Sequence, residues 1–158
     1  MDSTLLGALI GAGAAIAGSI VTAIATYFIN KSIDKNKLLT EKKEVLFQTI
    51  IEIERAMYRY YVCFNLALNG GKFNLEPIDE NRDRAIARLE IVSNIYFNNL
   101  ELSDLLESII KYEQESVIQI REPYFKGSVT YEQCNIAKEN YDKIPLATRS
   151  LKGLINQL

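Results

Sequence analysis

The chain has 158 residues, and its 18 Lys and Arg against 20 Asp and Glu give a formal net charge of −2. This length fits one domain, or one modest domain with an appendage. The charge balance argues against a protein that coats nucleic acid, and we expect no DNA partner. The sequence contains no histidine, which excludes imidazole bases, His-assisted nucleophiles and most zinc or non-haem iron sites.

The remaining reactive residues form no catalytic or metal-binding pattern. Two cysteines, Cys63 and Cys134, are too far apart in sequence for a CxxC pair or a metal knuckle. We favour two buried free thiols in a reducing compartment over a disulfide. Gly70-Gly71 lacks the strand-turn-helix context of a phosphate loop. The sequence therefore predicts no enzyme, no metal site and no cofactor.

The N-terminal region is a long apolar run. Residues 5–29 read LLGALIGAGAAIAGSIVTAIATYFI and hold no charge. As a helix rising 1.5 Å per residue, this run is roughly 37 Å long, which exceeds the hydrocarbon layer of about 30 Å. A cleaved signal peptide would need a basic start and a shorter apolar run, and a core helix seldom needs one so long. The run therefore predicts a transmembrane helix over residues 5–29.

The charges that flank this run predict its orientation. Lysines follow it at Lys31, Lys35, Lys37, Lys42 and Lys43, whereas no lysine or arginine precedes it. Because positively charged flanks stay in the cytoplasm, we expect residues 1–4 to form an extracytoplasmic tail. Residues 30–37 are then a basic juxtamembrane connector, and residues 38–158 form a cytoplasmic domain for ligand binding and oligomerisation.

One side of the apolar run is made of small and hydroxyl-bearing residues. Those expected to pack one membrane helix against another are Gly7, Gly11, Gly18, Ser19, Thr22 and Thr26. Small residues let helix backbones approach closely, and the hydroxyls can bond to a neighbouring helix, to their own backbone or to water. This sidedness favours a symmetric homo-oligomer over a monomeric anchor, with a pore as a further possibility.

Apolar residues recur at helical spacing through the rest of the chain. They predict four helices, over residues 38–68, about 79–97, 103–122 and 131–158. Without strand-like alternation, this is an all-α, four-helix bundle-like domain.

Local signals mark the ends of these four helices. Asn69-Gly70-Gly71 is expected to end the first helix. Ser103 reads as the N-cap of the third, which Pro123 should stop. Thr130 and Gln133 match a capping box for the fourth, and Pro145 should kink or divide that helix.

Two pairs of arginines at helical spacing are the candidate ligand-binding residues. Arg55 and Arg59 are four residues apart, as are Arg84 and Arg88 on the next helix. Guanidinium groups bind phosphates through two hydrogen bonds, and we expect Tyr58, on the same face as Arg55 and Arg59, to stack on a base. The alternative is that both pairs form surface ion pairs with Glu52, Glu80 or their neighbours. Together, the two pairs favour an anionic ligand or a subunit interface.

This organisation resembles the small membrane effectors of type III CRISPR antiviral systems. A short N-terminal span, residues 5–29, leads into a small helical domain that has no histidine and one Arg- and Tyr-rich helix. The resemblance implies that the cytoplasmic domain binds a cyclic oligoadenylate, typically cyclic tetra-adenylate, and that the membrane is then disrupted. The implied location is the bacterial inner membrane, and the implied partners are the lipid bilayer, copies of the chain itself and this cyclic oligonucleotide.

A ligand-independent function is the main alternative. A single-span interaction or phage-exclusion protein, acting as an oligomeric scaffold, would need the same span and helical domain but no small ligand. A holin-like pore former is a third possibility, although one span with a large cytoplasmic domain fits it poorly.

Overall fold

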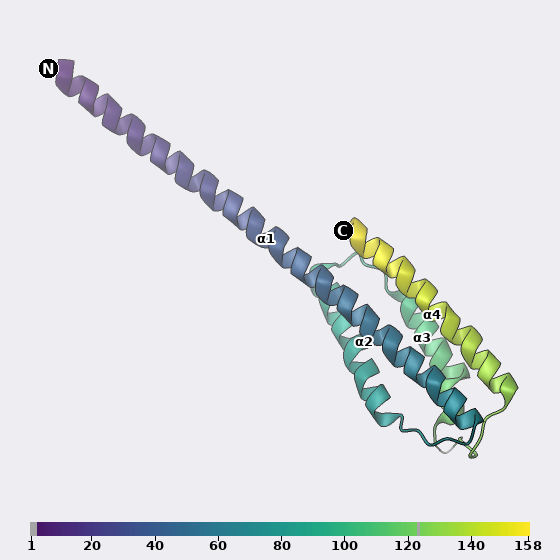
Figure 1. Cartoon of the computed structure of the whole chain (residues 1–158). Helices are drawn as coiled ribbons and strands as arrows, with labels where there is room; N and C mark the ends of the chain where they lie inside the picture. Colours follow the sequence, from purple (N-terminus) through teal and green to yellow (C-terminus); the bar gives the residue numbers. More distant parts are fainter. Residues whose placement is uncertain (1–2, 123) are drawn as a thin grey trace. The chain divides into compact units, whose positions relative to one another are not determined.

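The computed structural model describes residues 3–122 and 124–158, with the side chains of 19–122 and 124–158. These residues form α1 (Ser3–Leu68), α2 (Glu76–Tyr96), α3 (Ser103–Glu115), the short 3₁₀ helix η1 (Val117–Ile120) and α4 (Tyr131–Gln157). No strand occurs in these described ranges, and Figure 1 shows the helices in chain order. The predicted all-α class is confirmed.

The chain divides into two compact units, Met1–Glu41 and Lys42–Leu158. Within the part of the chain that the structure describes, no helix has the length and apolarity needed to cross a membrane. The structure does not describe the side chains of residues 5–18 of the predicted span, which include Gly7, Gly11 and Gly18. The other packing candidates, Ser19, Thr22 and Thr26, lie exposed on α1. The span and its packing residues stay predictions.

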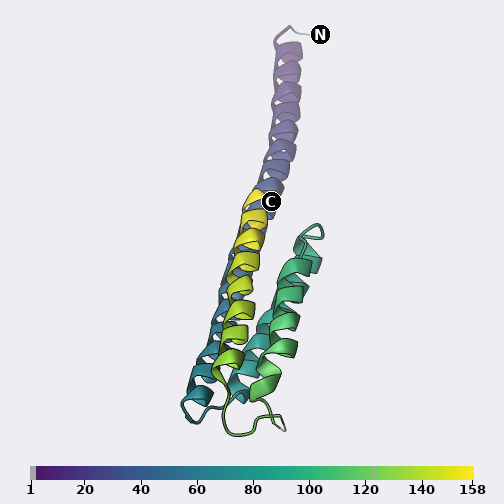
Figure 2. The ribbon, with the colours of Figure 1, turned by 90° about the vertical axis from the view of Figure 1, so that its right-hand side faces the viewer.

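The second unit is a four-helix bundle. The C-terminal part of α1, then α2, α3 and α4, run side by side in alternating directions, as Figures 1 and 2 show. Polar contacts join each neighbouring pair of helices: Tyr60 with Asp79 (α1–α2), Arg82 with Glu113 (α2–α3), Glu115 with Asn140 (α3–α4) and Glu54 with Lys152 (α4–α1). These contacts close a ring around the core.

A stripe along α1 is the centre of that core. Its fully buried members follow one another at spacings of three and four residues: Leu46, Ile50, Ile53, Met57, Tyr60 and Phe64. Burying each such apolar side chain contributes about 1.5–3 kcal/mol relative to leaving it exposed. The neighbouring helix α4 adds Ile144, Leu151 and Ile155. Both cysteines are buried free thiols, as predicted.

The predicted ends of α1 and α4 are confirmed. α1 ends at Leu68, and Gly70 follows with φ +69°, a left-handed conformation that glycine adopts without a steric penalty. At α4, Thr130 Oγ1 accepts from the Gln133 amide at 3.2 Å, while Gln133 Oε1 accepts from the Thr130 amide at 2.8 Å. These two reciprocal bonds satisfy amides that the first turn of a helix leaves unpaired.

Two other expected helix starts were wrong. α2 begins at Glu76, not near Asp79, because Pro77 fits the first helical turn, where no amide donor is needed. Ser103 is not an N-cap: it is the first residue of α3, and Leu102 precedes it without a side-chain cap.

The expected interruptions of the last two helices also differ from the structure. α3 ends at Glu115, not at residue 122, because the backbone of Ser116 (φ −122°, ψ −69°) leaves the helical region. The predicted stop at Pro123 lies outside the described residues. Pro145 does not divide α4, since the buried residues Ile144 and Thr148 on either side anchor both halves to the core.

A shared carboxylate at Asp79 joins three elements of the bundle. It accepts hydrogen bonds from the Tyr60 hydroxyl and from Arg121, whose Nη1 lies 2.7 Å from Asp79 Oδ2. Burial by itself raises the pKa of Asp79, but the bonds from Arg121 and Tyr60 outweigh it and hold that pKa below its usual value. Burial and the Asp79 carboxylate raise the pKa of Tyr60, which keeps its hydroxyl protonated as the donor.

We expect Asp79→Asn to lower the free energy of unfolding by about 1.5–3 kcal/mol, because it removes hydrogen bonds to a charged acceptor. Urea unfolding of the full chain, followed by circular dichroism, measures the loss. Because the folded-state pKa is depressed, the contribution of Asp79 is present above the unfolded pKa of about 3.9 and is lost as the pH falls through the folded pKa. The gap between wild type and variant should therefore narrow in acid, and a gap that does not change with pH would contradict this account. Tyr60→Phe is the control, because it removes one hydrogen-bond donor to Asp79 but keeps the carboxylate.

Candidate anion-binding cavity

The two predicted arginine pairs meet at one cavity. Arg55 and Arg59 of α1 and Arg84 and Arg88 of α2 line a hollow of about 240 Å³. The rest of its lining is Glu52, Ala56 and Asn81. The structure thus brings together four of the five residues that we selected as ligand-binding candidates.

Local sequence explains why these side chains converge. A spacing of four residues places Arg55 and Arg59 on adjacent turns of α1, and Arg84 and Arg88 on adjacent turns of α2. Between the α1 turns stands Ala56, whose side chain is only 3% exposed. Because alanine ends at its methyl group, it leaves room for the hollow between the longer side chains. Ala56 was not among the predicted site residues, although a small residue between two arginines at helical spacing is a signal that the sequence contains.

The cavity carries an excess of positive charge. Its lining holds four arginines and one glutamate. The Arg88 Nη1 atom lies 3.1 Å from Glu52 Oε2, so this arginine has the surface ion pair that the alternative interpretation expected. In the described residues, Arg55, Arg59 and Arg84 form no ion pair. Three guanidinium groups are therefore available to an anion.

Two carboxylates next to these arginines in the sequence, Glu54 and Asp83, are paired with other residues. Both oxygens of Glu54 accept from Lys152 of α4 at 3.0 Å. The Asp83 Oδ1 atom lies 2.7 Å from Arg82 Nη2. The four cavity arginines are exposed, so an anion can reach them from solvent.

Tyr58 does not join the arginines, contrary to the expectation that it shares their face. Its ring lies 6.1 Å from that of Tyr141 on α4, which also stacks on Tyr61 at 5.6 Å. The reason is helical geometry: Tyr58 and Arg59 are consecutive, so they point about 100° apart around α1. Arg59 faces α2, whereas Tyr58 faces α4, and a base-stacking role for Tyr58 in this cavity is not supported.

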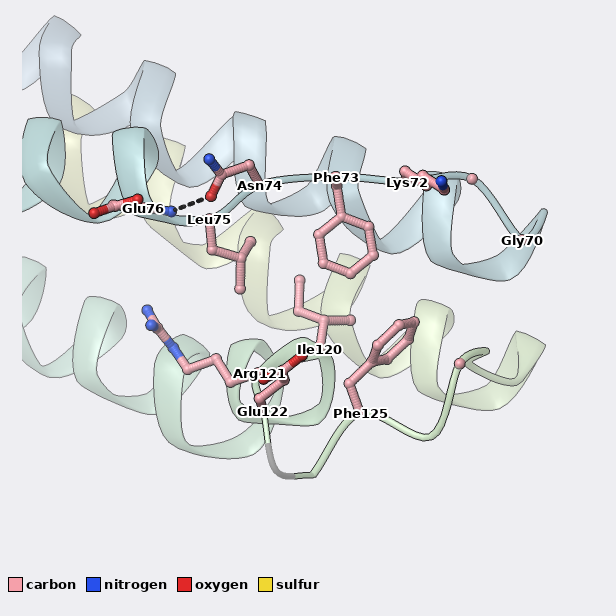
Figure 3. A pocket seen from close by; sticks show the side chains of 12 residues that line it. Gly70, Lys72, Phe73, Asn74, Leu75, Glu76, Ile120, Arg121, Glu122 and Phe125 are labelled. Atoms are coloured by element: carbon pink, nitrogen blue, oxygen red, sulfur yellow. Dashed lines mark hydrogen bonds between the residues drawn. The ribbon is translucent and has the colours of Figure 1, made fainter.

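A second, larger cavity of about 620 Å³ lies between the α1–α2 connection and the α3–α4 connection. Figure 3 shows Phe73 and Leu75 from one connection pointing toward Ile120 and Phe125 from the other. The two phenylalanine rings meet edge to face at 5.3 Å. Its charged lining residues, two of each sign, are Lys72, Arg121, Glu76 and Glu122. It therefore lacks the charge excess of the arginine cavity.

Comparison with protein-family models, curated proteins and solved structures found no match, so these comparisons assign no family. Among the described residues, no three His, Cys, Asp or Glu side chains gather in a group that could hold a metal ion.

The uncompensated charge should itself weaken the fold. We expect Arg59→Gln and Arg84→Gln each to raise the free energy of unfolding by roughly 0.2–0.5 kcal/mol at low ionic strength, because like charges repel. In 1 M salt, where the screening length is about 3 Å, the gain should disappear. Urea unfolding at the two salt concentrations measures it. Arg149→Gln, an exposed position outside the cavity, is the matched control; an equal gain there would show that net charge alone is responsible.

Proposed function

We propose that this chain is a membrane-anchored antiviral effector whose arginine cavity senses a cyclic oligoadenylate, most simply cyclic tetra-adenylate, and whose activation disrupts the membrane. The observation that carries the proposal is the meeting of four arginines from two helices at one cavity, three of them without an ion pair in the described residues. Guanidinium groups match the geometry of phosphate oxygens and bind them through paired hydrogen bonds.

The arrangement of the cavity supports a phosphate ligand over a general docking function. Each wall is a single helix, so the four side chains reach the hollow from two sides and can contact one ligand together. Asn81 adds an amide whose Nδ2 already donates to the Pro77 carbonyl at 2.7 Å, which leaves its oxygen to accept from a ligand hydroxyl or amino group. No protein catalysis is required, since a ligand that binds one arrangement of the bundle better than another shifts the population toward it.

The membrane part of the proposal is supported by the sequence of residues 5–29, which contains no charge over a length sufficient to span a bilayer. We propose one span with its N-terminus outside, a symmetric homo-oligomer, and a bundle in the cytoplasm. The single helix α1 contains both the predicted span and two of the four arginines. A ligand that moves this helix at Arg55 and Arg59 therefore acts on the chain segment that enters the bilayer.

A second candidate function has one observation in its favour. α1 leaves a row of apolar side chains exposed at spacings of seven, four and four residues: Ile51, Tyr58, Val62 and Leu66. Such a row suits contact with another protein surface. This favours the ligand-independent scaffold, a single-span interaction or phage-exclusion protein that works without a nucleotide.

Binding of cyclic tetra-adenylate to the full chain in detergent distinguishes the two functions. We expect isothermal titration calorimetry to show binding that weakens as salt is added, because phosphate contacts release counterions. Arg59→Gln and Arg84→Gln should each weaken it roughly 10- to 150-fold, the loss expected for one hydrogen bond to a charged group. Tyr58→Ala and Arg149→Gln should leave affinity unchanged. Equal affinity in wild type and both cavity variants would move the site elsewhere, for example to the cavity at Lys72; no binding at all would favour the scaffold.

Membrane attachment is tested by adding charge to the apolar run. Ile16→Lys with Ile20→Lys should move the protein from the membrane fraction to the soluble fraction, because each lysine near the centre of a span costs about 2.5–3.5 kcal/mol. Cell fractionation with alkaline carbonate extraction measures the shift. The control adds the same two charges at Ile91 and Ile95, which are exposed on α2. Recovery of the wild-type protein in the soluble fraction would contradict the anchor.

A further inference from the structure

Glu52 occupies an unusual position for an acidic residue. It is the one carboxylate among the described residues that line the arginine cavity. Its two oxygens lie 3.1 and 3.3 Å from Arg88 Nη1. The other three arginines have no such partner in the described structure. An anionic side chain therefore already occupies part of the site that a phosphate would need.

We propose that Glu52 is an internal competitor for the anion: its carboxylate occupies Arg88 until a multiply charged phosphate ligand displaces it. The inference rests on the proposed function to the extent that an anion enters the arginine cavity. It adds a specificity-determining residue, Glu52, to that site. It also defines the class of ligand that can displace Glu52 from Arg88.

The exposure of the ion pair makes displacement feasible. The side chains of Arg88 and Glu52 are 42% and 45% exposed, so water screens their attraction and the pair is weak. Glu52 also belongs to a regular helix, and its side chain can turn toward solvent without any change of the backbone. The Asp79 carboxylate, in contrast, accepts hydrogen bonds from Tyr60 and Arg121 and does not line the cavity.

The same arrangement discriminates among anions. A ligand with one charge, such as chloride or acetate, exchanges the Glu52 carboxylate on Arg88 for an equivalent contact and gains little. A ligand with two or more phosphate groups contacts Arg88 together with Arg55, Arg59 or Arg84, and these contacts together exceed the one that Glu52 makes. Glu52 thus raises the charge that a ligand must have before it occupies the whole site.

The opposite role for Glu52 is also testable. If Glu52 served to hold Arg88 in a binding geometry, its removal would weaken ligand binding, because Arg88 would have to be ordered when the ligand arrives. If Glu52 acted only by repelling anions through space, its effect would persist without Arg88. Competition for Arg88 predicts neither result.

The experiment measures the affinity of the full chain in detergent for inorganic pyrophosphate and for cyclic tetra-adenylate. Glu52→Gln should tighten the binding of both probes by about two- to fivefold, which is the change in affinity that corresponds to the free energy of one exposed ion pair. In an Arg88→Gln background the same substitution should have no effect. Glu44→Gln, an exposed residue of α1 outside the cavity lining, is the control for the change in net charge and should leave affinity unchanged.

The outcomes distinguish failure of the competitor from failure of the proposed ligand. Tighter pyrophosphate binding in Glu52→Gln, with no binding of cyclic tetra-adenylate by any variant, supports the competitor and overturns the proposed ligand. Binding of both probes without tightening, or with weakening, overturns the competitor and leaves the function in place. Tightening that survives in Arg88→Gln reduces Glu52 to a repelling charge and overturns the competition. Absence of binding by either probe, in wild type and in Glu52→Gln, overturns both proposals.

Discussion

The carboxylate of Asp79 is the constraint on which the position of α2 depends. It accepts the Tyr60 hydroxyl from α1 and the guanidinium of Arg121, which follows η1. Removing a carboxylate from water, even in part, is costly unless it keeps its hydrogen-bond partners. The elements that carry Asp79, Tyr60 and Arg121 must therefore pack in one arrangement. Apolar contacts alone would tolerate small rotations of α2, whereas a carboxylate with directional bonds on both sides does not. The rotation of α2 about its axis is thereby fixed.

Fixing that rotation also places the arginine cavity. Asp79 points into the bundle, and Arg84 and Arg88 lie on a different side of the same helix, directed toward α1. Their partners Arg55 and Arg59 leave α1 in different directions from Glu54, whose ion pair with Lys152 joins α1 to α4. Charge is therefore distributed by helix face: paired groups join the helices of the bundle, while a group of like charges remains together at one edge. A fold that needs only stability has no reason to keep these arginines adjacent.

The two cavities of the bundle suit different chemistry. The arginine cavity is small and positively charged, so it fits phosphate groups and not a large apolar molecule. The larger hollow between the connections has apolar walls from Phe73, Leu75 and Phe125 and balanced charges, which suits neither a polyanion nor a metal ion. The charge of the first cavity, not the size of the second, is the basis of the functional proposal.

The sequence by itself determined the helical class, the turn at Gly70 and the capping box at Thr130, because each depends on residues only a few positions apart. It also identified all four arginines, since i,i+4 spacing puts each pair on one side of its own helix. Only the tertiary structure decided that the two pairs share one cavity, that Glu52 occupies part of it, and that Tyr58 turns to Tyr141 instead. These facts depend on how one helix is rotated against another, and that rotation is fixed by contacts between distant parts of the chain, such as Asp79 with Tyr60 and Arg121, which no local pattern encodes.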